Sequence, residues 1–586
     1  MATPTPPPLT PPPASGPGAA NVRPTARADL DEAVARLRDR ARAFAGLPAR
    51  DKAGLLRACM PRIADAAEAW VATGCKAKGI GGALAAEEWL AGPLPTLRLA
   101  RLLAESLEAI AARGRPPLGT GARVRPDGRL ELDVFPGGAL DRVAFAGFRG
   151  SCLMAAGVDR GEAVRRQAGF YRARAPEGGV SLVLGAGNVS SIPPMDVFSK
   201  LFVEGFVCLL KMNPVNAWLG PILERALGPL VDHGFLRVVH GGGEVGQYLV
   251  DHDGVDDVHL TGSDHTHDLI VWGPPGPERE RRKAAGEPRL TRPISSELGN
   301  ISPVMVVPYT YADDELAFMA ANVATMVTNN ASFNCNAAKL LVTARTWPQR
   351  DAFLGLVARE LAQTPARAAY YPGAFDRYAR LTAGRDLLVP GGAADGELPW
   401  TIVRELDPGR ADDPAFRVEP FCAILGDVPL GDPGAAGDPV EFLDRATRFC
   451  NDTLWGTLNA ALLVPGALER DPVVGAGVER AIAELRYGTV AINHWPAVGY
   501  ALGSLPWGGH PSATLRDIQS GLGWVHNAFM LEGVDKSIVR GPLVVRPRPV
   551  WFTGNPRAVA VARRMLQLEL APSWSGLARV IGAALW

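Results

Sequence analysis

The chain has 586 residues, of which 47% are hydrophobic and 21% charged, and this composition excludes a small or globally disordered protein. Lys and Arg together number 61, as do Asp and Glu, so the formal net charge is zero. Because no overall positive field attracts polyanions, we expect no nucleic acid among its partners.

The N-terminal residues 1–24 contain nine prolines and one charge, which predicts a disordered, polyproline-prone tail over residues 1–25. This segment lacks the basic start and apolar stretch of a secretory signal, and no apolar run reaches the ~18 residues of a membrane span. We therefore expect a cytoplasmic protein without a transmembrane segment. The seven cysteines form no CxxC pair or Cys/His cluster, which argues against a disulfide framework and a bound metal.

Two kinds of pattern follow the tail. Apolar residues at helical spacing predict helices from Ala26 to about Ala111, and residues 124–175 contain the β-like runs RLELDVF and RVAFAGF, which suit an arm or hairpin. From Val180, helical stretches separate four apolar runs that end in polar residues: VSLVLGAGN, GFVCLLKMN, FLRVVHGGG and VDDVHLTGS. This alternation predicts a doubly wound parallel sheet, in which ligands bind beyond the carboxyl ends of the strands.

A second α/β region is predicted from about Ile301 to Leu505. The sequence after Pro511 contains a strand-like KSIVRGPLVV and an amphipathic C-terminal segment. Within the second region, NNASFNC precedes AAKLLV, an apolar run that fits either a helix or a strand.

Two residues in this region are candidates for nucleophilic and acid–base chemistry. The Cys335 thiol becomes a nucleophile where backbone N–H groups or a cation lower its pKa, although most single cysteines are core residues. Glu297 in PISSELGNISP is a carboxylate in an apolar segment, where burial is costly unless the group is paired or acts as a base. It is therefore a candidate for activating water, and the alternative is a loop or helix N-terminal acid.

The motifs are more informative together than singly. Their order and spacing resemble those of the aldehyde dehydrogenase superfamily over about Leu30 to His526: VLGAGNVSS, HLTGS, SELGNISP, NNASFNC, EPFCAIL and INHWP…PWGG. The resemblance implies that Cys335 is the nucleophile and Glu297 the general base. It also implies that the amide of Asn188 stabilises the oxyanion of a tetrahedral intermediate.

The resemblance further implies a nicotinamide cofactor, NAD or NADP. Its expected binding residues are Lys211 at the adenosine ribose, Gly262 and Ser263 beside the pyrophosphate, Glu419 at the nicotinamide ribose, Phe421 at the nicotinamide ring, and in addition Asn213 and Leu298. Pro214 stands where NAD-preferring members place an acid, so the sequence leaves both cofactors open. Extra sequence between Ser263 and Glu297 predicts a solvated loop, with contact to a cofactor phosphate as the alternative for its basic residues Arg279, Arg281, Arg282 and Lys283.

The implied fold is α/β, with two doubly wound Rossmann-like domains and a β-arm oligomerisation segment. We expect a cofactor-binding domain over 26–297 that includes the arm at about 120–178, and a catalytic domain over 298–510. Residues 511–586 then provide an oligomerisation strand within Lys536–Val545 and an extra helical extension. Family members associate through such arms, so we expect a homodimer or homotetramer.

The implied reaction is oxidation of an aldehyde to a carboxylic acid through a thiohemiacetal and a thioester on Cys335, with Glu297 activating the hydrolytic water. Aromatic residues expected near the pocket favour a bulky or aromatic aldehyde: Phe333, Trp495, Tyr500 and Trp507. One alternative is a CoA-acylating aldehyde dehydrogenase or acyl-CoA reductase, which does not need the base Glu297. The other is a non-catalytic scaffold of the same fold that binds a partner through its added ends.

Overall fold

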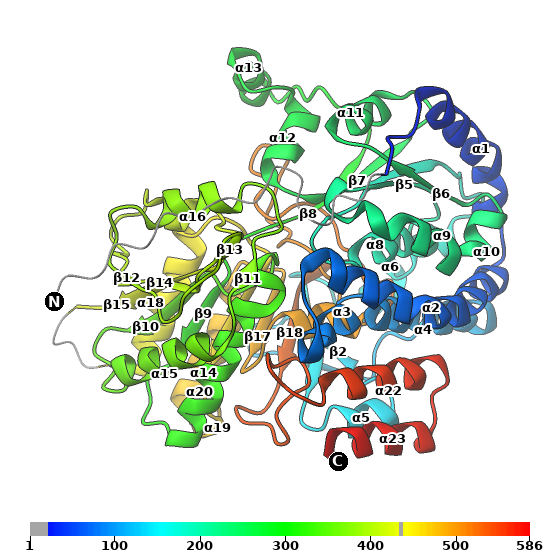
Figure 1. The fold of residues 1–586 in the computed structure, drawn as a ribbon. Helices are drawn as coiled ribbons and strands as arrows, with labels where there is room; N and C mark the ends of the chain where they lie inside the picture. The colour runs from blue at the N-terminus through cyan, green and yellow to red at the C-terminus, as the bar shows by residue number, and fades with distance from the viewer. Residues whose placement is uncertain (1–21, 433–436, 586) are drawn as a thin grey trace.

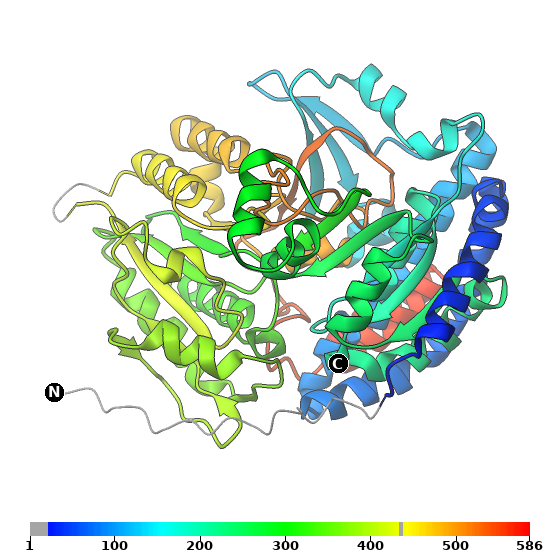
Figure 2. The ribbon, with the colours of Figure 1, turned by 90° about the horizontal axis from the view of Figure 1, so that it is seen from above.

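The computed structural model describes residues 22–432 and 437–585, so the predicted tail lies outside it up to residue 21. Two lobes lie side by side, each built on its own sheet (Figures 1 and 2). We call them the small-sheet lobe, built on β4–β8, and the large-sheet lobe, built on β9, β10 and β14–β17. Within the described ranges no helix is long and apolar enough to cross a membrane.

The predicted helical opening is confirmed. The first helix buries the stripe Leu30, Val34, Leu37 and Ala41 against the small sheet, as its i, i+4, i+7 spacing predicts. The second ends at Gly79, whose φ of +65° closes a left-handed C-cap. The elements of this region are α1 (Arg27–Ala45), α2 (Ala49–Lys78), η1 (Gly82–Leu84), α3 (Ala85–Leu90) and α4 (Pro93–Arg113).

The small sheet is parallel throughout, as the alternating pattern predicts. Its strand order is β6-β5-β4-β7-β8, and Val183 of the central strand pairs with Leu210 and His259 on either side. The strands are β4 (Val180–Leu184), β5 (Val207–Met212), β6 (Leu236–His240), β7 (Asp257–Gly262) and β8 (Ile294–Leu298). The intervening helical segments are α8 (Ile192–Phe198), η2 (Ser199–Val203), η3 (Pro214–Leu219), α9 (Gly220–Ala226), α10 (Gly228–Asp232), α11 (Gly243–Asp251), α12 (Asp264–Trp272) and α13 (Pro277–Ala285).

The large sheet has a parallel centre in the order β17-β16-β9-β10-β15-β14. The last three residues of the ambiguous run AAKLLV begin β10, which pairs with β15 over Leu340–Ala344 and with β9 on its other side. The strands of this lobe are β9 (Pro303–Val306), β10 (Leu340–Ala344), β11 (Arg367–Ala368), β12 (Leu387–Leu388), β13 (Glu397–Leu398), β14 (Thr401–Val403), β15 (Ile424–Leu430), β16 (Asn459–Leu463) and β17 (Thr489–Ile492). Its helices are α14 (Asp313–Thr328), η4 (Asn329–Ser332), α15 (Arg350–Gln363), α16 (Ala374–Thr382), α17 (Pro414–Arg417), α18 (Pro439–Asp452), α19 (Gly466–Arg470), α20 (Pro472–Glu484) and α21 (Ala497–Leu502).

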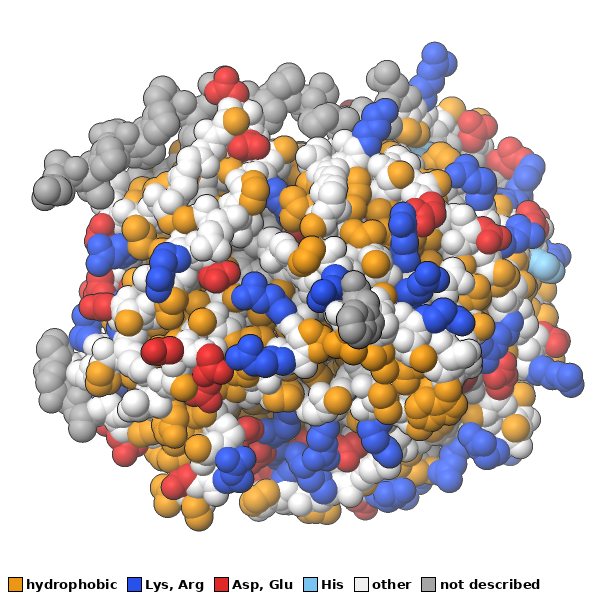
Figure 3. Space-filling model, turned by 60° about the horizontal axis from the view of Figure 1, so that its bottom comes forward, with side chains coloured by type: hydrophobic (Ala, Val, Ile, Leu, Met, Phe, Trp, Pro, Cys, Tyr) orange, Lys and Arg blue, Asp and Glu red, His pale blue; other side chains and the backbone are white. Residues whose placement is uncertain are grey.

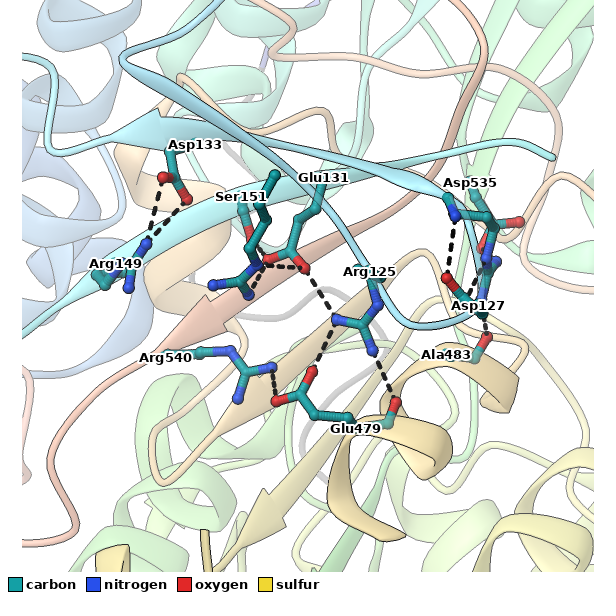
Figure 4. Close-up of polar contacts among 12 residues, drawn as sticks. Arg125, Asp127, Glu131, Asp133, Arg149, Ser151, Glu479, Ala483, Asp535 and Arg540 are labelled. Carbon is teal, nitrogen blue, oxygen red and sulfur yellow. Dashed lines mark hydrogen bonds and ion pairs between the residues drawn. The ribbon is translucent and has the colours of Figure 1, made fainter. Parts of the chain in front are cut away.

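The arm strands join this sheet within one chain. The antiparallel hairpin β1 (Gly121–Val124) and β2 (Leu130–Phe135) continues into β3 (Arg149–Met154), which pairs with β18 (Val534–Arg540). The last strand lies parallel to β17, so one sheet runs from the arm across the large-sheet lobe. Buried ion pairs tie the hairpin to α20 (Figure 4).

The second β-like run of the arm was wrongly predicted. Residues 142–148, RVAFAGF, contain the end of α5 (Ala139–Ala144) and a turn, while the strand begins at Arg149. Asp141 in the first turn of that helix is paired with Arg98 of α4, a contact between distant segments that alternation cannot report. The arm also contains α6 (Arg160–Arg166) and α7 (Gly169–Arg172).

The predicted solvated loop between Ser263 and Glu297 also differs from the structure. It contains α13, which has no buried residue and lies at the edge of the molecule beyond α12 (Figure 1). Ion pairs from Arg281 and Arg282 to Glu278 stabilise this helix at i, i+3 and i+4 spacing. The segment is therefore solvated, as expected, but helical.

The predicted amphipathic C-terminus forms two helices. They are α22 (Ala558–Leu570) and α23 (Trp574–Leu585), which pack on each other. The first contacts α3 and α4, and the second contacts α5 of the arm. Together these elements form the lower face of the molecule in Figure 1.

Candidate active site

A cleft of about 690 Å³ runs between the lobes at the carboxyl ends of the small-sheet strands. Parallel strands end on one side of a sheet, which is why residues far apart in sequence meet there. All ten residues singled out from the sequence line this cleft: Asn188, Lys211, Asn213, Gly262, Ser263, Glu297, Leu298, Cys335, Glu419 and Phe421.

Cys335 follows a segment of unusual backbone conformation. Asn330, Ala331 and Ser332 have φ values of +51°, +55° and +66°, a region that residues other than glycine seldom adopt. Three such residues in succession turn the chain sharply between α14 and β10 and bring the thiol to the cleft. Strain of this kind persists where surrounding contacts hold it in place.

Those contacts centre on Asn330. Its Nδ2 donates to the backbone oxygens of Asn188 and Phe333 at 3.0 and 3.1 Å, and its Oδ1 accepts from Lys78 Nζ at 2.9 Å. The buried ammonium of Lys78 also donates to Glu88 Oε1 at 2.6 Å. Sequence reasoning missed this network because its members come from α2, α3 and two loops.

The side chain of Asn188 lies next to the nucleophile segment. Its Nδ2 donates to the backbone oxygen of Phe333 at 2.9 Å, which leaves the second amide hydrogen for another acceptor. The backbone oxygen of Cys335 accepts from Ser302 Oγ and Asn459 Nδ2, each at 3.3 Å. Both ends of the loop are thus held by hydrogen bonds.

Glu297, at the end of β8, is buried beside Cys335. Burial raises the pKa of Glu297 to about 8, and the nearby charge of Asp196 acts in the same direction. Burial also raises the pKa of the Cys335 thiol, and a charged Glu297 raises it further. The carboxyl and the thiol therefore compete to remain protonated, and ionisation of either depends on the other.

Lys339 is a buried cation near the thiol. Its buried Nζ donates to Ser332 O at 3.2 Å, and its charge lowers the pKa of Cys335 against the stronger effect of burial. The sequence does contain a signal for this residue, because a lysine inside the apolar run AAKLLV needs a polar partner when it is buried.

The cleft suits a dinucleotide with two ribose rings and a pyrophosphate. Ser263 caps α12 by accepting from Thr266 N at 3.2 Å, so the first amides of this helix face the cleft, where an anion binds. Buried Glu419 Oε1 has no hydrogen-bond partner among the described residues and is therefore available to a ribose hydroxyl. A Cβ at Gly299 would lie 1.9 Å from Glu419 Oε2, which explains the glycine in SELG.

Arginines that sequence reasoning missed also line the cleft: Arg377, Arg380 and Arg417. Arg377 Nε donates to Pro420 O at 2.9 Å and so fixes the backbone that carries Glu419 and Phe421. None of the residues of α13 lines the cleft, so the proposed phosphate contact of Arg279, Arg281, Arg282 and Lys283 has no support.

A second, apolar pocket of about 120 Å³ reaches Cys335 from the opposite side. Of the four aromatic residues expected there, Trp495 and Tyr500 line it. Phe333 and Trp507 do not; both are fully buried, and Phe333 packs against Tyr370 and Phe421. Cys335 lies where the cleft and the pocket meet.

Comparison with known protein families finds one that resembles the part of the chain around the site. Residues 154–367, which contain the loop of Asn188, β8 and the Cys335 segment, match the model of the aldehyde dehydrogenase family. The match spans somewhat more than a third of the chain, which is therefore similar to this family over that region.

Solved structures of aldehyde dehydrogenases share the fold. The NAD-dependent aldehyde dehydrogenase of Sinorhizobium meliloti is 20% identical, with a TM-score of 0.59 and coverage of 92% of both chains. The NADP-dependent glyceraldehyde-3-phosphate dehydrogenase of Bacillus halodurans C-125, complexed with NADP, is 17% identical, with a TM-score of 0.59 and coverage of 90% of this chain and 94% of that one. An aldehyde dehydrogenase of Mycobacterium tuberculosis complexed with NAD⁺ is 16% identical, with a TM-score of 0.56 and coverage of 91% and 95%. None of the curated proteins matches the chain.

Proposed function

We propose that this protein is an aldehyde dehydrogenase that uses a nicotinamide cofactor and oxidises an aldehyde to a carboxylic acid by way of a thioester on Cys335. The observation that carries the proposal is the position of Cys335 at the junction of the polar cleft and the apolar pocket. A nucleophile at such a junction contacts an aldehyde from one side and a hydride acceptor from the other.

In the first step the Cys335 sulfur attacks the aldehyde carbon, and the thiol proton passes to Glu297, which lies beside it. The carbonyl oxygen becomes an oxyanion. The free hydrogen of the Asn188 amide and the backbone N–H of Cys335 stabilise this charge, which is larger in the transition state than in the aldehyde.

A bound nicotinamide supplies the hydride acceptor, NAD or NADP. We assign Lys211, Asn213, Gly262, Ser263, Leu298, Glu419 and Phe421 to holding it, because all line the cleft. Both cofactors remain candidates, since solved relatives contain one or the other. Loss of hydride leaves a thioester on Cys335.

Hydrolysis completes the reaction. Glu297 first releases the thiol proton to solvent and then removes a proton from water as the water oxygen attacks the thioester carbon. The carbon–sulfur bond breaks, the carboxylic acid leaves, and the Cys335 sulfur takes the proton back from Glu297. A CoA-acylating enzyme transfers the acyl group to a thiol and does not require this base. Retention of Glu297 therefore favours hydrolysis over acyl transfer.

The proposed domain division follows these roles: cofactor binding by residues 26–297 and catalysis by residues 298–510. A homodimer or homotetramer remains our proposal for the assembly. A non-catalytic scaffold is disfavoured because Cys335, Glu297 and Asn188 are all present at one site.

The test measures reduced-nicotinamide absorbance with aldehydes of several classes, with NAD⁺ and NADP⁺ in parallel, and with and without CoA. We expect turnover without CoA, and loss of turnover in Cys335→Ala with cofactor binding retained. Cys450→Ala, which removes a buried thiol away from the cleft, is the matched control. Turnover only with CoA would support the acylating alternative, and persistent turnover in Cys335→Ala would exclude the assigned nucleophile.

A further inference from the structure

The apolar pocket at Cys335 adjoins a larger cavity. This outer chamber, of about 690 Å³, shares a wall with the inner pocket of about 120 Å³. Five residues line both spaces: Phe145, Val550, Trp551, Met565 and Glu569. The outer chamber therefore adjoins the inner pocket, and the inner pocket in turn is lined by the nucleophile.

The C-terminal segment builds most of the outer chamber. Residues 545–551, α22 and α23 form one side, and the arm segment that contains α5 forms the other. Side chains from these elements are largely apolar: Val143, Phe148, Val545, Val561, Leu568, Leu577, Val580 and Ile581. The chamber volume lies within the ~300–1,000 Å³ of ordinary small-molecule sites.

The charged residues along the two spaces are neutralised by one another. Arg98 pairs with Asp141 at 3.1 Å and with Glu569, which also pairs with Arg101 at 2.7 Å. These four side chains are at most 15% exposed. The arginines of residues 545–557 that line the chamber are exposed to solvent at its rim: Arg546, Arg548 and Arg557. The two spaces thus offer no unpaired buried charge to a phosphorylated or carboxylated aldehyde.

The two volumes constrain the shape of the substrate. The inner pocket is narrow and lined by apolar side chains such as Leu94, Ile192 and Val498, so it accepts an unbranched chain next to the carbonyl. The outer chamber is several times larger and accepts the remainder of that chain.

We propose that the substrate is a long-chain aliphatic aldehyde, and that residues 545–585 enclose an outer chamber for its hydrocarbon tail. The proposal rests on the proposed function, because it names the substrate class of that site. Trp551 and Met565 stand at the neck between the two spaces, where an unbranched thioether side chain adapts readily to a hydrocarbon.

Exposed apolar residues at the opening agree with this role. Trp574, Ile581 and Leu585 of α23 are 62%, 40% and 51% exposed, and all three line the chamber. Val143 of α5 faces the same chamber and is 46% exposed. Figure 3 shows this side of the molecule, where hydrophobic side chains gather among Lys and Arg. A bound hydrocarbon tail covers such residues.

The first experiment compares propanal, hexanal, decanal and dodecanal as substrates of the full-length enzyme. Since each buried methylene contributes ~0.8 kcal/mol, we expect kcat/KM to rise by about two- to fourfold per methylene until the chamber is filled. A flat series, with propanal as good a substrate as dodecanal, would overturn the proposal.

The second experiment fills the outer chamber without touching the inner pocket. Leu568 lines only the chamber, so Leu568→Trp should leave propanal turnover unchanged and lower kcat/KM for dodecanal by at least about tenfold. Val473→Trp, at an exposed position on α20, is the matched control and should change neither rate. Equal loss for both aldehydes in Leu568→Trp would contradict the assignment of the chamber to the tail.

Direct binding separates this proposal from the proposed function. If propanal is oxidised but chain length and Leu568→Trp have no effect, the chamber proposal fails and the catalytic one stands. If no aldehyde is oxidised with either cofactor, the catalytic proposal fails, and calorimetric titration with decanol then tests the chamber. Saturable binding that Leu568→Trp abolishes supports the chamber, whereas absence of binding excludes it.

Discussion

Ser332 occupies a backbone conformation that favours glycine. Its φ is +66°, and its buried hydroxyl has no hydrogen-bond partner in the part of the chain that the structure describes. The residue therefore contributes strain and an unsatisfied polar group, each with a cost in stability. The backbone bend at this position is needed to present Cys335, but the serine side chain is not.

We predict that Ser332→Gly stabilises the protein by about 1 kcal/mol and raises its thermal midpoint. Asn330→Gly is the matched control: its φ of +51° also suits glycine, but its side chain bonds to Lys78, Asn188 and Phe333. Asn330→Gly should therefore lower the thermal midpoint. Differential scanning fluorimetry checks both, and equal destabilisation would show that strain at Ser332 is unimportant.

The raised pKa of Glu297 predicts a pH dependence. Burial lifts this pKa from 4.5 to about 8, so at neutral pH most molecules carry a protonated Glu297 that cannot accept a proton. Where deacylation limits turnover, we expect kcat to increase with pH, with a midpoint near 8. The measurement is a pH–rate profile of the wild type and Glu297→Gln.

Glu297→Gln should lose the increase of kcat with pH and should accumulate the thioester, which mass spectrometry of the intact protein detects. The variant keeps the size of the side chain and removes its titration. If the variant kept a midpoint near pH 8, the pH dependence of kcat would belong to another group.

The sequence predicted the residues that line the cleft better than the residues that hold them in place. Motif residues such as Asn188, Glu297 and Glu419 stand at or near strand ends, where the parallel topology brings them together. Lys78 and Asn330 escaped prediction because their role depends on side chains from distant segments that meet only in the folded chain. Pairings of that kind leave no periodic signal.

Buried ion pairs between side chains hold helix α22 against α4. The Glu569 carboxylate of α22 forms ion pairs with Arg98 and Arg101 of α4, and Arg98 also forms an ion pair with Asp141 of α5. Opposite charges near Asp141 hold its pKa below the ordinary value although burial acts to raise it, so acid pH weakens the cluster. The cluster therefore joins three elements that enclose the outer chamber.

We predict that Glu569→Gln lowers the free energy of unfolding of this region by about 3 kcal/mol, since it removes the buried carboxylate that Arg98 and Arg101 share and leaves each arginine with a single carboxylate partner. Hydrogen exchange in α22 and α23 should accelerate, while exchange in β4–β8 stays unchanged. Glu105→Gln is the control, because Glu105 is 46% exposed in its pair with Arg101 and contributes little. Unchanged exchange in α22 would contradict a structural role for the cluster.

Element prediction succeeded where one face of an element determines burial. The strands β4–β7 are buried runs with polar ends, and the pattern alone identified them. It failed for residues 142–148 and for α13, two short helical segments without a buried stripe: α5 is paired with Arg98 of distant α4, and α13 is stabilised by local ion pairs. The order of strands in the large sheet was not predictable either, because it joins segments from both ends of the chain.

At the scale of the whole molecule, the arm is fixed to the large-sheet lobe by a buried network (Figure 4). Arg125 pairs with Glu131 of β2 and Glu479 of α20, each at 2.8 Å, and Ser151 also donates to Glu131. Burial acts to raise the pKa of Glu131, but hydrogen bonds from Ser151 and Arg125 hold it below its ordinary value. The stabilisation from Glu131 is therefore present at neutral pH and lost as the pH falls.

We predict that Glu131→Gln weakens docking of the β1–β2 hairpin by about 3 kcal/mol, because Arg125 then has one charged partner instead of two. Limited proteolysis at residues 125–129 should become faster. Asp133→Asn is the control on the same strand, since its pair with the exposed Arg149 is worth less than 1 kcal/mol. Equal protease resistance of Glu131→Gln and Asp133→Asn would refute the prediction.

The continuous sheet can be completed only late in synthesis of the chain. The outer edge of β3 ends at Met154, and its partner β18 begins at Val534, about 380 residues later. At roughly 5–20 residues per second, a ribosome needs about 20–80 s to make the missing strand. During that interval the arm presents an unpaired strand edge, the kind of surface on which nascent chains aggregate. Nascent chains of this protein are therefore expected to depend on a chaperone that binds extended segments until β18 emerges.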